Sequence, residues 1–269
     1  MENKTVLITG GSSGIGKAIG TYLVAKGYTV YGTTRSLNKY PDFHTFPLLE
    51  MDVRDPASVE KAITQLLKKE HRLDVLINNA GVGITGPIEE TPAKEILAAF
   101  DTNFNGPLHV IKSVLPQMRG QKAGLIINIT SIAGYMGLPY RGIYSATKGA
   151  LEIATEALRM ETKDFGIAIT NLAPGDFATN IAAGRYHTPL LDASPYRKSY
   201  GSVLQQIDEH VDRGEDPILV AKMVLKIIKT EHPKVHYKVG TFTQKFSLIL
   251  KKALPDKVFE KMLLKHYKL

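Results

Sequence analysis

Residues 5–16 read TVLITGGSSGIG, and this stretch decides the fold of the chain. Its first part, 5–9, is a β-rich apolar run that predicts a strand, and the pattern over 14–27 predicts a helix. Between them, glycines allow a tight turn and a close approach of the backbone to a pyrophosphate, which would rest on the helix N-terminus. An ordinary glycine-rich turn is the alternative. Its position between a strand and a helix favours dinucleotide binding, although the spacing Gly-x-x-x-Gly-x-Gly differs from the commoner Gly-x-Gly-x-x-Gly.

The alternation of strand and helix continues along the chain. Further strands are predicted over 29–33, 45–51, 75–78, 124–129, 167–172 and 234–239, and further helices over 56–70, 92–118, 143–164 and 216–230. Three of these helices begin with a proline after a capping side chain, in Asp55-Pro56, Thr91-Pro92 and Asp216-Pro217. The alternation predicts an α/β fold: a Rossmann-type, doubly wound, parallel seven-stranded sheet with helices on both faces.

Polar and glycine-rich segments follow four of the predicted strands: Gly10–Gly16, Asn78–Gly81, Thr130–Ser131 and Pro174–Gly175. Ligands of open α/β sheets bind beyond the carboxyl ends of the strands. We therefore expect these four segments to meet at one edge of the sheet and to form a single site.

Bulk composition fits one large domain with a sizeable core, which we place over residues 1–240. There is no cysteine in the 269 residues, so disulfides and thiolate chemistry are excluded, and no metal site is expected. The N-terminus lacks the features of a signal peptide, and no stretch has the roughly 18 apolar residues of a membrane span. The expected location is cytoplasmic.

The last thirty residues form a basic extension, over 241–269. Seven lysines against Asp256 and Glu260 give residues 240–269 a net charge of +5, out of +8 for the chain. The basic balance therefore belongs to the tail and does not indicate nucleic-acid binding. Apolar residues recur there at helical spacing, namely Phe242, Phe246, Ile249, Leu250 and Ala253, then Val258, Phe259, Met262 and Leu263. This amphipathic pattern predicts helices that dock on the body or a partner subunit, or that lie on an anionic membrane surface.

Tyr144 and Lys148 are one turn apart in the predicted helix 143–164, so they share a face. A phenol with a pKa of about 10 is a poor base at neutral pH. One cation at about 4 Å and an effective dielectric of about 20 is worth roughly 4 kcal/mol, enough to bring a tyrosine near pH 7. With Ser131 holding a carbonyl oxygen, the pair would interconvert an alcohol and a ketone. A solvated helix face is the alternative for the pair taken alone.

The end of the second strand bears on cofactor choice. It reads Tyr31-Gly32-Thr33-Thr34-Arg35 and lacks the acidic residue that would bond the ribose 2′-hydroxyl of NAD. Two hydroxyls and a guanidinium suit a 2′-phosphate, so we expect NADP(H) rather than NAD(H). Asp52 either accepts from the adenine amino group or caps the next helix, although Asp55 is the better cap.

Together these residues resemble the short-chain dehydrogenase/reductase family from about residue 4 to 240. The resemblance rests on the order and spacing of Thr9–Gly16, Asp52, Asn78-Asn79-Ala80-Gly81, Asn103, Ser131, Tyr144-Ser145-Ala146-Thr147-Lys148 and Pro174-Gly175 with Thr179. It implies that Tyr144 is the general acid/base, that Lys148 lowers its pKa and bonds the nicotinamide ribose, that Ser131 orients substrate and that Asn103 holds a relay water. A role of Asn103 in bending its helix is the alternative.

The resemblance also implies a set of cofactor-binding residues: Gly10, Ser12, Ser13, Gly14, Ile15, Gly16, Thr34, Arg35, Asp52, Val53, Asn78, Ala80, Gly81, Tyr144, Lys148, Pro174, Gly175, Phe177 and Thr179. Fastening of neighbouring strands is the alternative for Asn78 and Asn79. The family usually forms dimers or tetramers, so a homodimer or homotetramer is expected.

The predicted substrate is an apolar carbonyl or alcohol such as a steroid, retinoid or sphingoid. In the family the segment over about 179–216 closes over substrate, and here it is rich in apolar and aromatic side chains: Ile181, Tyr186, Leu190, Leu191, Tyr196, Tyr200, Val203 and Leu204. Packing of this lid on the body is the alternative. Competing functions are a 3-oxoacyl-carrier-protein reductase and a non-catalytic dinucleotide sensor. The complete set of Ser131, Tyr144, Lys148 and Asn103 argues against the sensor.

Overall fold

A parallel sheet of seven strands forms the centre of the computed structural model, which describes residues 4–177, 184–212 and 214–269. The strand order is β3-β2-β1-β4-β6-β7-β9. The bounds are Leu48–Glu50, Thr29–Thr34, Thr5–Ile8, Val75–Asn78, Gly124–Ile129, Ile167–Pro174 and His236–Val239 in that order. Every neighbouring pair is parallel, and β1 and β4 are buried throughout. The predicted fold class is confirmed.

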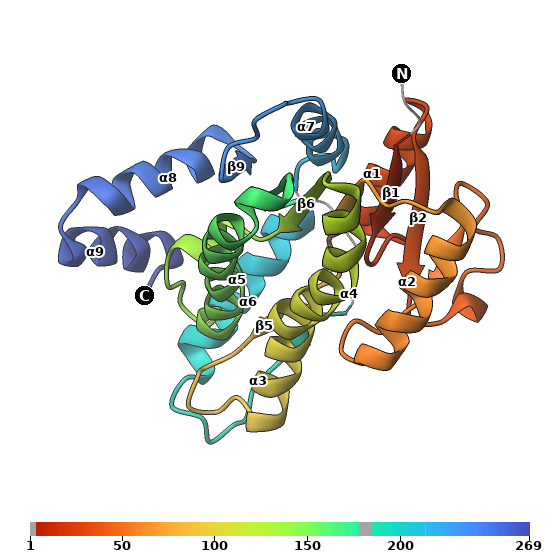
Figure 1. The fold of residues 1–269 in the computed structure, drawn as a ribbon. Coiled ribbons are helices and arrows are strands. Elements are labelled where there is room, and N and C mark those ends of the chain that lie inside the picture. Colours follow the sequence, from red (N-terminus) through yellow and green to blue (C-terminus); the bar gives the residue numbers. More distant parts are fainter. Residues whose placement is uncertain (1–3, 178–183, 213) are drawn as a thin grey trace.

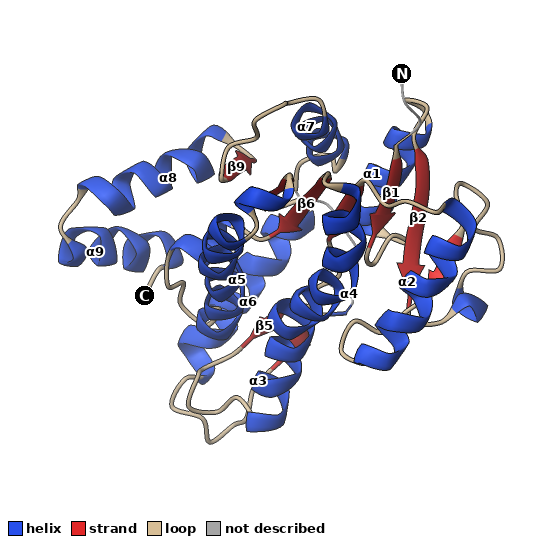
Figure 2. Ribbon diagram, in the orientation of Figure 1, coloured by secondary structure: helices blue, strands red, loops and turns tan. Residues whose placement is uncertain are grey.

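Helices cover both faces of this sheet (Figures 1 and 2). One face packs against α1 (Gly14–Val24) and α7 (Ile218–Ile228), which contribute Ile19, Leu23 and Val224 to a fully buried apolar cluster. The other packs against α2 (Pro56–Glu70) and α4 (Gly106–Gln121), with α5 (Gly142–Glu161) beside β7. Burial on both faces explains why the strands are nearly continuous apolar runs.

Several predicted bounds are confirmed and others are corrected. The elements over 56–70, 75–78 and 124–129 match, whereas the predicted strand 45–51 is shortened to β3. The predicted helix 92–118 is wrong as one helix. It divides into α3 (Ala93–Phe100), a π-helical segment (Asp101–Asn105) and α4. Pro107 has no backbone N–H, so it cannot donate the hydrogen bond that an α-helix would make to the carbonyl of Asn103.

The three predicted helix starts behave differently. Asp55 accepts a hydrogen bond from the Ala57 amide at 3.0 Å, with Pro56 first in the helix, as predicted. Asp216 likewise accepts from the Ile218 amide at 2.8 Å, but Pro217 precedes the helix. The prediction for Thr91 is wrong, because its hydroxyl donates to the Pro87 carbonyl at 2.7 Å and α3 begins only after Pro92.

The segment expected as a substrate lid contains a short parallel pairing and a helix. β8 (Tyr186–His187) pairs with β5 (Ile84–Thr85), and α6 (Arg197–Asp212) follows. Its aromatic groups bind the body: the Tyr200 hydroxyl donates to the Thr85 carbonyl at 3.2 Å, and Tyr196 donates to Glu89 at 2.6 Å. Leu190 and Leu191 face solvent, and Ile181 lies outside the described residues.

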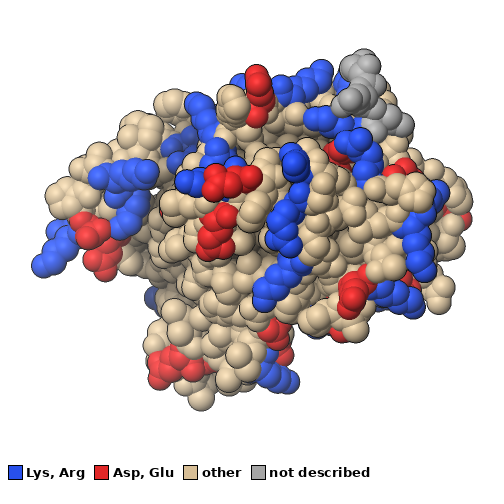
Figure 3. Space-filling view, viewed as in Figure 1, with Lys and Arg blue, Asp and Glu red and all other residues tan. Residues whose placement is uncertain are grey.

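The C-terminal extension forms α8 (Phe242–Ala253) and α9 (Asp256–Tyr267), which lie at one end of the molecule in Figure 1. A reciprocal capping box between Thr241 and Gln244 starts α8. Leu248 and Phe259 are buried against Ile132, Met136 and Ala173 of the body, so the extension docks on its own chain. Lysines and acidic residues of this end face solvent in Figure 3. Within the described ranges no helix is long and apolar enough to cross a membrane.

Candidate active site

A continuous groove follows the carboxyl ends of β1, β2, β4, β6 and β7. It consists of two cavities that share the lining residues Ile15, Asn79, Gly81 and Val82. The first cavity is lined by Ser131, Tyr144 and Lys148. The second, of about 320 Å³, is lined by the glycine-rich turn and Arg35. The segments that the sequence predicted at one edge therefore do meet there.

The glycine-rich turn provides an anion cradle. Gly10 and Gly14 have φ of 64° and 51°, a conformation that residues with a Cβ rarely adopt. A Cβ on Gly11 would lie 2.7 Å from the Gly32 Cα, so turn and strand touch. The Ser13 side chain makes no capping bond at the start of α1. The amino end of α1 thus fits a pyrophosphate group.

The far end of the groove is rich in positive charge. Arg35 and Lys39 line it beside the hydroxyls of Thr34 and Ser36. Asp52 also lines it, but its carboxylate is held by Arg54, with Nη2–Oδ2 at 2.6 Å. That hydrogen bond lowers the pKa of Asp52 despite partial burial. Lys39 and Arg54 were not singled out from the sequence. Lys39 lies four residues after Arg35, and this short spacing between two cations was the sequence signal that could have identified Lys39 as part of the same site.

Lys148 and Tyr144 come from the first turns of α5 and line the cavity at the other end of the groove. The Lys148 ammonium is buried and donates to the Ile129 carbonyl at 3.0 Å. Burial lowers the pKa of Lys148, and the charges of Tyr144 and Glu152 oppose that shift. The Lys148 ammonium and the Tyr144 phenol therefore line the same cavity and interact electrostatically.

Ser131 lies two residues after the end of β6 and caps the 3-10 turn Ile132–Tyr135. Its Oγ accepts from the Ala133 amide at 3.2 Å, which fixes the hydroxyl while its own proton stays available to the cavity. Arg141, three residues before Tyr144, places its guanidinium 5.4 Å from the centroid of the Tyr144 ring. Arg141 and Asp176 line the same cavity and were not singled out from the sequence.

Asn103 lies behind the cavity, in the π-helical segment. Its side chain is fully buried, accepts from the Val82 amide at 2.8 Å and donates to the Val82 carbonyl and to Thr147. A Cβ on Gly81 would stand 3.2 Å from Asn103 Oδ1 and 3.4 Å from Lys148 Nζ. Gly81 therefore keeps open the space between these two polar groups.

Most of the predicted cofactor residues line the groove: Gly10, Ser12, Ser13, Gly14, Ile15, Thr34, Arg35, Asp52, Val53, Ala80, Gly81, Tyr144, Lys148, Pro174, Gly175 and Phe177. Two are placed elsewhere. Asn78 is buried and donates to Asn128 at 2.9 Å, which joins β4 to β6, so the strand-fastening alternative holds for it. Gly16 packs against the Gly10 carbonyl inside the turn. Thr179 lies outside the described residues.

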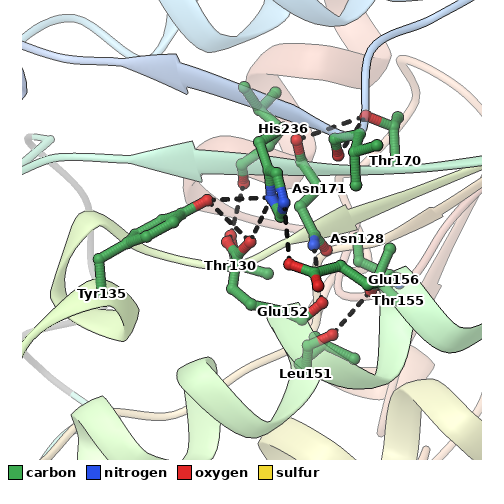
Figure 4. Close-up of polar contacts among 12 residues, drawn as sticks. Asn128, Thr130, Tyr135, Leu151, Glu152, Thr155, Glu156, Thr170, Asn171 and His236 are labelled. Atoms are coloured by element: carbon green, nitrogen blue, oxygen red, sulfur yellow. Dashed lines mark hydrogen bonds and ion pairs between the residues drawn. The ribbon is translucent and has the colours of Figure 1, made fainter.

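A buried polar network lies one turn beyond Lys148 (Figure 4). The Glu152 carboxylate accepts from Thr130 and, at 2.7 Å, from Tyr135, and it contacts His236 Nδ1 at 2.8 Å. The other nitrogen of His236 lies 3.0 Å from Glu156 at the surface. Burial and the Glu152 charge raise the pKa of Tyr135, so this phenol remains a donor. The network joins β6, β9 and α5 beneath the cavity.

Comparisons with known proteins agree with this geometry. The family model described as short chain dehydrogenase matches residues 4–189. The chain is 37% identical to a 3-ketodihydrosphingosine reductase of Bacteroides thetaiotaomicron, over 97% of this chain and 96% of that protein. It is 32% identical to an NADPH-dependent 3-dehydrocapnine reductase of Ornithobacterium rhinotracheale, over 97% and 96%. A crystal structure of a short-chain dehydrogenase from Streptomyces avermitilis superposes with a TM-score of 0.82 at 31% identity, covering 98% and 97%.

Proposed function

The chain belongs to the short-chain dehydrogenase/reductase family, and we propose that it is an NADPH-dependent reductase of a lipid-like ketone. Its relatives support an oxidoreductase that interconverts carbonyl and alcohol groups. The observation that carries the proposal is that Ser131, Tyr144 and Lys148 line one cavity, and that this cavity shares lining residues with the one that holds the glycine-rich turn and Arg35. The roles below rest on this placement.

In the proposed mechanism the groove residues hold the cofactor. The amides at the start of α1 would bind its pyrophosphate, and Arg35 and Lys39 would bind a 2′-phosphate. Pro174, Gly175 and Phe177 line the cavity of Tyr144 and Lys148, where they would contact the nicotinamide. When bound, the cofactor supplies a hydride to the carbonyl carbon.

The remaining chemistry belongs to the protein. Ser131 and Tyr144 hold the ketone oxygen, and Tyr144 delivers the proton that this oxygen gains as the alcohol forms. Lys148 stabilises the resulting tyrosinate, because its charge is buried beside it. Asn103 Oδ1 and Lys148 Nζ both border the space that a Cβ on Gly81 would occupy, and Asn103 would hold a relay water there.

NADPH is proposed from the charge of the adenosine end. Among the residues lining that cavity, Arg35, Lys39 and Arg54 stand against the single carboxylate of Asp52, which Arg54 already neutralises. A 2′-phosphate dianion fits this surplus of cations better than a bare ribose. The name of the Ornithobacterium relative, which includes NADPH dependence, supports the same choice.

A lipid-like substrate is proposed from the relatives, one of which is named for 3-ketodihydrosphingosine. A direct test follows NADPH absorbance with 3-ketodihydrosphingosine, a ketosteroid, retinal and an acetoacetyl thioester. The proposal predicts that a lipid-like ketone is reduced with the highest kcat/KM. Preferred turnover of the thioester would point to a 3-oxoacyl-carrier-protein reductase, and binding of NADPH with no turnover of any substrate would point to a sensor.

We also propose the wider organisation of the protein. Residues 1–240 would form the catalytic domain, with 241–269 as an extension, in a homodimer or homotetramer; sedimentation velocity tests the subunit number.

Peripheral membrane contact through the extension is proposed because Phe242 and Ile249 are 76% and 60% exposed beside lysines. Co-sedimentation with anionic vesicles tests it: Phe242→Glu should reduce binding, and vesicles that fail to retain the wild type would refute it.

A further inference from the structure

A third cavity opens beside the catalytic one, between the C-terminal helices and the body. Its volume is about 370 Å³, within the range of about 300–1,000 Å³ that is usual for ligand pockets. Its apolar lining comes from three places. The turn after Ser131 gives Ile132, Ala133, Met136 and Leu138, α6 gives Ile207, and the extension gives Phe246, Leu250, Phe259, Met262 and Leu263.

This third cavity, called the chamber below, is continuous with the catalytic cavity. Ser131, Arg141, Gly175 and Asp176 line both. Polar groups gather at that shared boundary: Arg141 Nη1 lies 3.9 Å from Asp176 Oδ1, and Gln244 of α8 donates to Asp176 Oδ2 at 2.9 Å. Beyond the boundary the lining is predominantly apolar. A molecule whose reacting carbonyl meets Ser131 could therefore extend an apolar chain between α8 and α9.

We infer that the chamber between α8, α9 and the Ser131 turn binds the long alkyl chain of the substrate. The inference rests on the proposed function as a ketone reductase. It adds which part of the protein selects the substrate. The described side chains of the 184–212 segment supply only Ile207 to the chamber, whereas the extension supplies one whole wall. The extension is thus assigned a substrate-binding role in addition to its docking on the body.

The test compares homologues of 3-ketodihydrosphingosine with eight, twelve and eighteen carbons. Each buried methylene is worth a factor of about four in binding, so kcat/KM should rise at least about tenfold from the shortest homologue to a longer one. Leu250→Trp fills the chamber and should abolish this gain in kcat/KM with chain length. Ile249→Trp, on the exposed face of the same helix, is the matched control and should keep the gain.

Ser247→Leu provides a milder filling variant of the same wall, in case Leu250→Trp is unstable to heating. A folded filling variant that keeps the full chain-length gain, or a wild type with no gain, would overturn the inference while leaving the reductase in place. If no homologue is reduced at all, the proposed function fails separately. Calorimetric titration with the eighteen-carbon amino alcohol that corresponds to the longest ketone then tests whether the chamber binds the alkyl chain. Binding that is lost in Leu250→Trp but kept in Ile249→Trp supports the inference, and equal binding refutes it.

Discussion

Glu152 lies one helical turn beyond Lys148 on α5, and both charged side chains are buried, at 4% and 5% exposure. The Glu152 charge partly opposes the lowering of the Lys148 pKa by burial. Thr130, Tyr135 and His236 in turn surround the Glu152 carboxylate (Figure 4). A buried cation beside the proposed catalytic phenol is thus supported by a buried anion that is itself fully hydrogen-bonded.

Glu152→Gln tests this support. Losing a buried carboxylate that accepts several hydrogen bonds should lower the free energy of unfolding by about 1–3 kcal/mol in urea titrations. The Lys148 pKa should fall further, because an opposing negative charge is gone, so the alkaline limb of the ketone-reduction profile should move to lower pH. Glu156→Gln, at the exposed end of the network, is the control and should change stability by less than about 0.5 kcal/mol. Equal effects of the two variants would contradict the account.

Tyr135→Phe tests the raised pKa of that phenol. In the unfolded chain the phenol ionises near its ordinary pKa of about 10, whereas in the folded protein it stays neutral. Its stabilising contribution is therefore complete below that pH and is lost as the pH rises above it, by about 1.4 kcal/mol per pH unit. The wild type should exceed Tyr135→Phe in stability at pH 8, and the difference should shrink between pH 10 and 11. A difference that stays constant over this range would show that the phenol titrates normally.

Arg35→Ser tests the proposed cofactor preference. Loss of one or two charge-assisted bonds to a 2′-phosphate should raise KM for NADPH by about 10- to 100-fold. KM for NADH, which has no such phosphate, should change by less than about threefold and serves as the internal control. Parallel changes for the two cofactors would mean that Arg35 does not distinguish them.

The sequence was sufficient where the signal is local. The periodicity of apolar residues and the positions of turn residues predicted the parallel sheet. The run 5–16 predicted the anion cradle, because the conformation of a glycine turn between a strand and a helix depends on residues close by in sequence. The break at Asp101–Asn105 was not predicted: Pro107 was a local signal for it, but the contacts between Asn103 and Val82, 21 residues apart in the chain, could not be seen. Helical periodicity does not reveal such a contact.

Long-range partners also explain what was missed in the site. Glu152 reads as an ordinary polar helix residue until His236, 84 residues later, is brought against it by β9. The boundary formed by Arg141, Asp176 and Gln244 likewise needs three distant segments. Asn78 and Asn79 are adjacent in sequence, yet only Asn79 lines the groove, because successive side chains point to opposite faces.

The role of Tyr144 is tested most directly by Tyr144→Phe, which removes one hydroxyl from the cavity. NADPH affinity, measured by the fluorescence of the bound cofactor, should stay within about twofold of the wild type. Turnover of the best ketone should fall by about 10²- to 10⁴-fold, the usual contribution of a general acid. A Tyr144→Phe enzyme that binds NADPH normally and keeps most of its turnover would contradict the assignment of proton transfer to this phenol.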